Sequence, residues 1–278
     1  MKKIAAVMTA LVLILVPILG LAQIDSTASE LLHAMQKYVR ETDNITVAGE
    51  HTFSLLYNGT PTTITYHDLT VTFHDPHIIH NMVDLENGEK HHLYFVQMGD
   101  EMVCFASQGT EEYQSYAEEI HQDELSPETM GELDSITHPI DAMVEASIAG
   151  EEEVTVNGTA YQCIRIEITT HVLDFVEELV HNALLANPAF DDAWSDEIEA
   201  SLADMTMPMT YWIEKETGIL IQYASDVTDL YAGVYAYIPD KLDGGAKYTE
   251  YKHTYQVVGV NDAEEIMIPA KYIAYTEH

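Results

Sequence analysis

The tightest group of potential metal ligands is the run His74-Asp75-Pro76-His77, followed closely by His80. A zinc site needs imidazole nitrogens that converge about 2.0–2.1 Å from one ion. In a continuous extended strand, His74 and His80 would share a face roughly 20 Å apart, and His77 would point away from them. Only a turn at Pro76 could bring His74 and His77 together. The spacing therefore predicts no metal site and no cofactor, although fourteen histidines allow a response to pH.

The sequence contains none of the common catalytic motifs. It has no G-x-S-x-G, no H-E-x-x-H, no Walker A loop and no Rossmann glycine pattern. Acidic pairs such as Glu118-Glu119 and Asp191-Asp192 recur along the chain, so they single out no acid–base pair. We therefore expect a protein that is not an enzyme.

Acidic residues dominate the composition, with 47 Asp and Glu against 11 Lys and Arg and a formal net charge of −36. Nucleic acid binding is excluded as a function class because phosphate neutralisation needs Lys and Arg. Anionic lipid head groups would be repelled for the same reason. The charge is typical of a surface that keeps a protein soluble outside the cell.

The first residues have the pattern of a secretory signal. Lys2 and Lys3 precede an apolar run, and the small-residue site Gly20-Leu21-Ala22 follows. We expect cleavage after Ala22 and a secreted or extracytoplasmic protein. The alternative is an uncleaved membrane anchor, because residues 4–22 are about long enough to span a bilayer. Gln23 stands where a lipoprotein would have its lipidated Cys, so lipidation is not expected.

The two cysteines, Cys104 and Cys163, both lie in strand-like runs. Export permits a disulfide, but the spacing alone cannot establish a pair. A single bridge and two buried thiols both remain open.

The chain alternates predicted strands with a few amphipathic helices. The most distinctive stretch is 211–223, two apolar runs around a turn in which Gly218 takes a positive φ. A helix is expected over Ser26–Thr42, with Thr27 and Glu30 as its capping box. Further strands are expected at 51–57, 62–73, 77–85, 92–98, 101–106, 153–156, 161–169, 230–238, 247–258 and 266–275, and further helices at 111–120 and 139–148. The apolar face of 62–73 changes parity, which predicts a bulge near His67-Asp68.

Residues 172–204 are predicted to form two amphipathic helices that meet at Asn187-Pro188. Their apolar side chains could line a ligand cavity or simply fill a core, and a helical apolar stripe is typical of both. The candidate ligand-binding residues are Phe175, Val176, Leu179, Leu184, Trp194, Ile198 and Leu202 of these helices, together with Trp212 of the hairpin.

Three stretches carry a resemblance to a known family. They are the hairpin Tyr211-Trp212-Ile213-Glu214-Lys215-Glu216-Thr217-Gly218, the strand pair Val156-Asn157-Gly158-Thr159-Ala160-Tyr161-Gln162-Cys163, and the closing strand Ile266-Met267-Ile268-Pro269. With them, the chain from about Thr27 to its end resembles the LolA/LolB-like lipoprotein-carrier superfamily, in particular its secreted Gram-positive relatives. The resemblance implies an α+β fold in a single domain over residues 23–278. That fold is a half-open antiparallel β-barrel around an N-terminal helix, with residues 172–204 as a helical lid over an apolar cavity.

The function expected from this resemblance is non-catalytic binding of a hydrophobic small molecule, a lipid or a lipoprotein acyl chain, by a monomer. The alternative is a cell-envelope sensor or scaffold that has the same barrel filled by its own side chains and a protein partner in the envelope. An apolar cavity of several hundred Å³ beneath 172–204 would favour the carrier, because ligand sites usually measure about 300–1,000 Å³.

Overall fold

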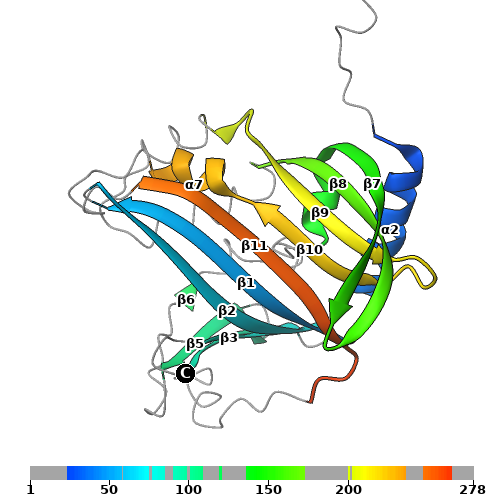
Figure 1. The fold of residues 1–278 in the computed structure, drawn as a ribbon. Coiled ribbons are helices and arrows are strands. Elements are labelled where there is room, and N and C mark those ends of the chain that lie inside the picture. The colour runs from blue at the N-terminus through cyan, green and yellow to red at the C-terminus, as the bar shows by residue number, and fades with distance from the viewer. Residues whose placement is uncertain are drawn as a thin grey trace, which may run out of the picture.

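The computed structural model describes residues 24–57, 59–74, 77–84, 90–98, 101–108, 119–120, 136–172, 200, 202–235 and 247–264. Its dominant feature is one curved sheet of eleven strands in the order β6-β5-β4-β3-β2-β1-β11-β10-β9-β8-β7 (Figure 1). Neighbouring strands are antiparallel, and the sheet is open between its edge strands β6 and β7. The elements are α2 (Ser26–Arg40), β1 (Asn44–Tyr57), β2 (Thr60–His74), β3 (His77–Asp84), β4 (Lys90–Met98), β5 (Glu101–Gln108), β6 (Glu119–Ile120), α4 (His138–Asp141), β7 (Met143–Val156), β8 (Thr159–His171), β9 (Thr206–Glu214), β10 (Leu220–Asp226), α7 (Thr228–Tyr235) and β11 (Lys247–Val260).

The predicted N-terminal helix is confirmed, but its cap differs. The side chain of Asp25, not Thr27, accepts from the first free amides, those of Thr27 at 2.8 Å and Ala28 at 3.2 Å. One side of α2 buries Leu32, Met35 and Val39 and two further residues, Ala28 and Gln36. The helix lies beside the β7 end of the sheet (Figure 1).

The hairpin at residues 211–223 is confirmed as β9 and β10. Gly218 has φ +74°, and its amide donates to the carbonyl of Glu214 at 2.9 Å. The turn therefore needs a residue that tolerates the left-handed conformation.

Four local predictions are wrong. The helix expected at 111–120 does not include its last two residues, because Glu119–Ile120 pair with β5 as the strand β6. The β1–β2 register is unbroken at His67 and Asp68, so the parity change reflects apolar side chains on both faces of β2 and not a bulge. Residues 139–148 form only the short α4 before β7, because pairing with β8 along the strand overrides the helical spacing. Residues 230–238 fall largely in α7, which begins where the Asp226 carboxylate accepts from the Thr228 amide at 3.1 Å.

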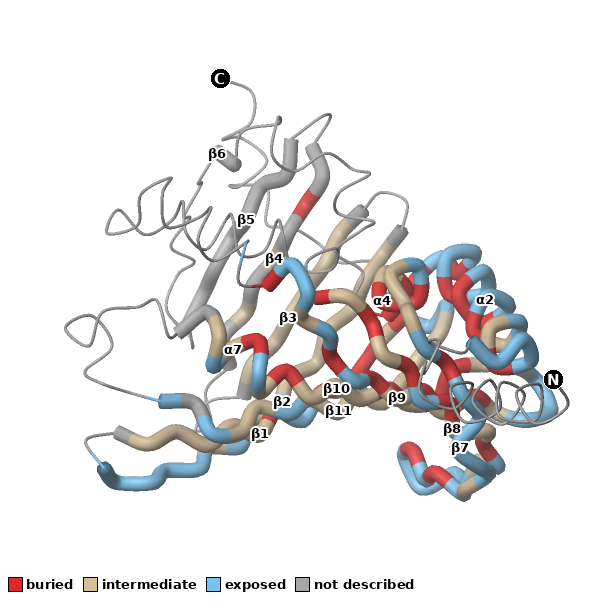
Figure 2. Tube along the Cα trace, turned by 90° about the horizontal axis from the view of Figure 1, so that it is seen from above, coloured by how far each residue is buried: buried red, intermediate tan, exposed pale blue. Residues whose placement is uncertain are grey.

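The main core lies on the face of the sheet that carries Ile45, Val47, Tyr211 and Tyr223, which we call the inner face. In Figure 2, buried segments gather at the right of the view, around α2, α4 and β9. Tyr211 is fully buried, and its hydroxyl donates to the carbonyl of Ile136 at 2.9 Å. This half of the inner face is filled by the protein's own side chains.

A smaller core lies on the opposite, outer face. The β7–β8 hairpin changes register between Ile148 and Gly150, and Gly150 has φ +148°. Beyond that point, the hairpin contributes Val154, Val156 and Cys163, which pack with Ile221.

Cys163 is a free, buried thiol, and burial raises its pKa to about 11. Cys104 lies on β5, separated from β8 by β4, β3, β2, β1, β11, β10 and β9. In the part of the chain that the structure describes, no helix has the length and apolar character needed to cross a membrane.

Candidate functional site

The structure describes two of the eight candidate ligand-binding residues, and it does not bring them together. Leu202 is fully buried in the main core. Trp212 is half-buried on the outer face, packs against the smaller core, and donates from its indole nitrogen to Glu152. Phe175, Val176, Leu179, Leu184, Trp194 and Ile198 lie outside the described residues. Lining of a ligand cavity by those six stays a prediction.

Beyond the main core, the inner face carries a row of rings that the sequence analysis did not identify. The row consists of His51 and Phe53 on β1, Tyr66 on β2, and Tyr251, His253 and Tyr255 on β11. The register places His51 opposite both Tyr66 and His253, and it places Phe53 opposite Tyr251. His51 stacks on Tyr66 with ring centroids 4.3 Å apart, and Tyr251 contacts Tyr231 of α7 at 4.3 Å. We call these six residues the aromatic row.

A buried polar network is built into this row. His51 is 5% exposed, and its Nε2 lies 2.9 Å from Oδ1 of Asp68. The other carboxylate oxygen of Asp68 accepts from Asn81 at 2.6 Å. On the opposite side of the ring, Nδ1 of His51 lies 2.8 Å from Nδ1 of His253, and the Tyr255 hydroxyl lies 3.3 Å from that second nitrogen.

Burial and hydrogen bonding together set the charges in the network. Burial alone would raise the pKa of Asp68. Its hydrogen bond and charge interaction with His51, together with hydrogen bonds from Asn81 and Thr70, lower the pKa by more than burial raises it. The pKa of Asp68 therefore lies below its ordinary value. Burial, reinforced by the nearby His51, lowers the pKa of His253 to about 4. Burial also raises the pKa of Tyr255 well above its ordinary value. At neutral pH, the network therefore contains a carboxylate, a neutral His253 and a neutral phenol.

A glycine makes room for this network. Gly49 lies opposite Asp68 on β2 and opposite Tyr255 on β11. A Cβ at this position would collide with the Asp68 carboxylate, and it would lie 2.9 Å from both Nε2 of His51 and Cε1 of Tyr255. The close approach of the network to the backbone therefore requires glycine.

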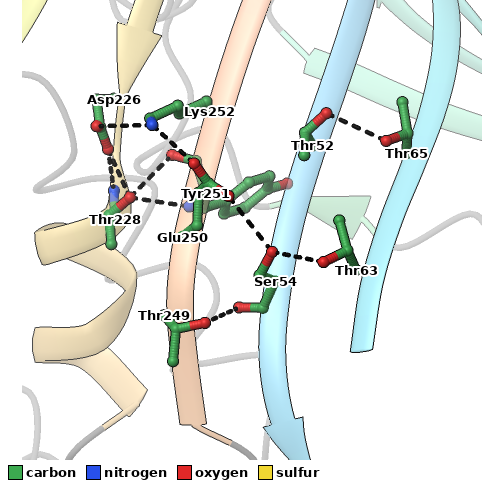
Figure 3. Close-up of polar contacts among 10 residues, drawn as sticks. All are labelled: Thr52, Ser54, Thr63, Thr65, Asp226, Thr228, Thr249, Glu250, Tyr251 and Lys252. Atoms are coloured by element: carbon green, nitrogen blue, oxygen red, sulfur yellow. Dashed lines mark hydrogen bonds and ion pairs between the residues drawn. The ribbon is translucent and has the colours of Figure 1, made fainter. Parts of the chain in front are cut away.

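A polar cavity of about 510 Å³ lies where β10 ends. β10 stops at Asp226, whereas Thr206–Pro208 of β9 and Thr249–Glu250 of β11 extend past it, so a gap opens beside the first turn of α7. Figure 3 shows Lys252 between two carboxylates, with Nζ 2.7 Å from Glu250 and 4.0 Å from Asp226. The other polar residues that line the cavity are Ser54, Thr206, Thr228, Asp229 and Thr249. This cavity differs in chemistry from the apolar cavity that the carrier interpretation predicts.

Two further groups of histidines bear on metal binding. His74 and His77 lie directly opposite each other in the β2–β3 ladder. On the outer face, Nε2 of His80 lies 3.1 Å from Nδ1 of His92, and the rings are stacked. Among the described residues, no three His, Cys, Asp or Glu side chains converge as ligands of one ion.

Sequence inspection could not find the network because its members are far apart in the chain. His51 and His253 are separated by 202 positions, and Asp68 lies on a third strand. The available signal was the alternation Tyr251, His253, Tyr255, which places three rings on one face of β11.

No protein-family model matches the chain, and no curated protein matches it. Among solved structures, the chain is similar to lipoprotein LppX of Mycobacterium tuberculosis, at 11% identity and a TM-score of 0.49, over 87% of this chain and 100% of that one. It is also similar to LprF of Mycobacterium bovis, at 12% identity and a TM-score of 0.45, over 88% and 98%. A LolA superfamily protein of Nitrosomonas europaea matches at 6% identity and a TM-score of 0.24, over 88% and 96%. At these sequence identities and TM-scores, the matches do not indicate which ligand this chain binds or what activity it has.

Proposed function

We propose that this chain is an exported, non-catalytic binding protein that holds a hydrophobic ligand on the inner face of its sheet. The observation that carries the proposal is the half-buried state of Phe53 and Tyr66, which continue the inner face beyond the main core, and of Tyr251, which packs against the edge of that core. Aromatic rings bury a large apolar area at little cost in conformational entropy, so they suit an apolar ligand.

Residues 172–204 would form the lid over the aromatic row, and 23–278 would be one domain, released as a monomer after cleavage at Ala22. Transfer of an apolar chain from water gives about 0.8 kcal/mol per CH₂, so a 16-carbon chain gives on the order of 12 kcal/mol before ordering costs.

The scaffold alternative also has an observation in its favour. Leu202, from the end of the expected lid, is fully buried in the main core with Met207 and Leu230. If the whole lid packs as Leu202 does, the inner face is filled and no ligand enters.

Binding of a fluorescent 16-carbon fatty acid decides between the two. We expect the wild-type protein to bind the probe, and we expect Phe53→Asp and Leu179→Asp to lose it with the far-UV circular dichroism signal of the sheet retained. Thr52→Asp is the matched control, because Thr52 is the neighbour of Phe53 on the opposite face and bonds Thr65 there. Failure of the wild-type protein to bind any apolar probe would leave the scaffold as the better interpretation.

A further inference from the structure

We propose that His51 and His253 form a binding site for one divalent transition-metal ion, Zn²⁺ or Cu²⁺, with the Tyr255 hydroxyl as an adjoining oxygen ligand. The site lies within the aromatic row, and it does not require that a hydrophobic ligand binds there. It is built from two strands that pair directly, because His51 of β1 and His253 of β11 are cross-strand partners. Imidazole nitrogen suits both of these metals, and Cu²⁺ binds most tightly in the divalent series.

The first argument is the direction of the lone pairs. The Asp68 carboxylate can only accept a hydrogen bond, so Nε2 of His51, 2.9 Å away, carries a proton. In a neutral imidazole the lone pair then lies on Nδ1, and this atom faces Nδ1 of His253 at 2.8 Å. In the absence of metal, a single proton between the two Nδ1 atoms satisfies both rings. When a metal ion binds between the two Nδ1 atoms, this proton, which belongs to His253, moves to Nε2 of the same ring, so that both Nδ1 lone pairs face the ion and both rings stay neutral.

The second argument is the hydrogen bond that holds His51 on the side of its ring away from the proposed metal ion. A metal-binding histidine commonly donates its other N–H to a carboxylate, which fixes the tautomer and the ring orientation. Asp68 has this relation to His51, and Asn81 and Thr70 hold Asp68 in turn.

The third argument is distance. With Zn–N bonds of about 2.0–2.1 Å, two nitrogens of a tetrahedral site lie about 3.3 Å apart. The two Nδ1 atoms are 2.8 Å apart, so the rings would separate by about 0.5 Å. The Tyr255 hydroxyl lies 3.3 Å from Nδ1 of His253, which matches the separation of two ligands of one tetrahedral ion.

The test is Cu²⁺ titration of chelator-treated full-length protein in excess Mg²⁺, which occupies the many surface carboxylates. Electron paramagnetic resonance then reports whether nitrogen is coupled to the copper. We expect one nitrogen-coupled Cu²⁺ per chain, at least 10-fold weaker binding in His253→Gln, and 10- to 100-fold weaker binding in Asp68→Asn. Zn²⁺ should compete with Cu²⁺ for the same site.

The control is His80→Gln, which removes one member of the His80–His92 pair on the outer face. This variant should bind Cu²⁺ as the wild-type protein does. The proposal is overturned if His253→Gln binds unchanged, if His80→Gln alone loses the ion, or if no nitrogen-coupled Cu²⁺ forms. Circular dichroism of each variant before titration identifies a loss caused by unfolding. If His253→Gln fails to fold, Asp68→Asn and metal-dependent thermal stabilisation of the wild-type protein decide, and absence of both effects rejects the site.

Discussion

Gly49 lies directly opposite Asp68 in the β1–β2 ladder, and the Asp68 carboxylate occupies the space that a side chain at Gly49 would fill. We expect Gly49→Ala to lower the free energy of unfolding by about 1–3 kcal/mol, because an added methyl group must displace a hydrogen-bonded buried pair. Urea denaturation measures this change. Ala48→Ser, one residue earlier on the opposite face, should change stability much less. Equal stability of Gly49→Ala and the wild-type protein would show that Asp68 and His51 can move aside freely.

Stability should fall in acid because of His253 and His80, each with a pKa lowered to about 4, first by burial and then by a neighbouring histidine. The unfolded pKa of histidine is about 6.5, so between pH 6.5 and 4 the unfolded chain binds protons that the folded chain does not. The stability that the two neutral histidines contribute is therefore fully present above pH 6.5, and it is lost as the pH falls towards 4. Each group contributes up to about 1.4 kcal/mol per pH unit in this window.

Asp68 affects stability at lower pH than the two histidines do. Its folded pKa lies below the ordinary value, so its contribution is present above that value and is lost as the pH falls below it. Urea unfolding at a series of pH values should show the histidine loss first, and His253→Gln should flatten the slope between pH 6.5 and 4 without changing the loss at lower pH. An unchanged slope would contradict a neutral, buried His253.

The elements that could be predicted from the sequence are those whose signals are local. The β9–β10 hairpin follows from two apolar runs and one glycine with positive φ, and α2 follows from its apolar spacing. In contrast, Met143–Ile148 has helical spacing in the sequence but becomes a strand, because β8 pairs with it. A partner strand contributes more than local propensity, and the local pattern does not reveal it.

The candidate site was harder to predict for the same reason. Each ring of the aromatic row is an ordinary strand residue by itself, and only the ladders β2–β1–β11 bring Asp68, His51 and His253 together. The lid hypothesis depended on local amphipathic spacing, which does not distinguish a cavity wall from a core. Leu202 is fully buried, so at this position the apolar stripe fills a core.

Gly218, with φ +74°, provides a test of the hairpin turn. A Cβ there would meet no atom within 4 Å, so any cost of substitution comes from the backbone conformation and not from a clash. We expect Gly218→Val to lose about 1 kcal/mol or more, because a β-branched residue is strained in the left-handed region. Gly218→Asn should lose less, because Asn tolerates that region. Equal denaturation midpoints for the two variants would mean that the turn relaxes to another conformation.

The residue that caps the N-terminus of α2 differs between the sequence prediction and the structure. The sequence favours a capping box made by Thr27 and Glu30, whereas in the structure Oδ1 of Asp25 accepts from the amides of Thr27 and Ala28. Removal of a side-chain cap leaves helix amides without a partner and costs about 0.5–2 kcal/mol. We therefore expect Asp25→Ala to lower the free energy of unfolding by about 1 kcal/mol, and Thr27→Ala to change it by much less. Thermal and urea denaturation of the mature protein measure both, and a larger loss in Thr27→Ala than in Asp25→Ala would restore the capping box.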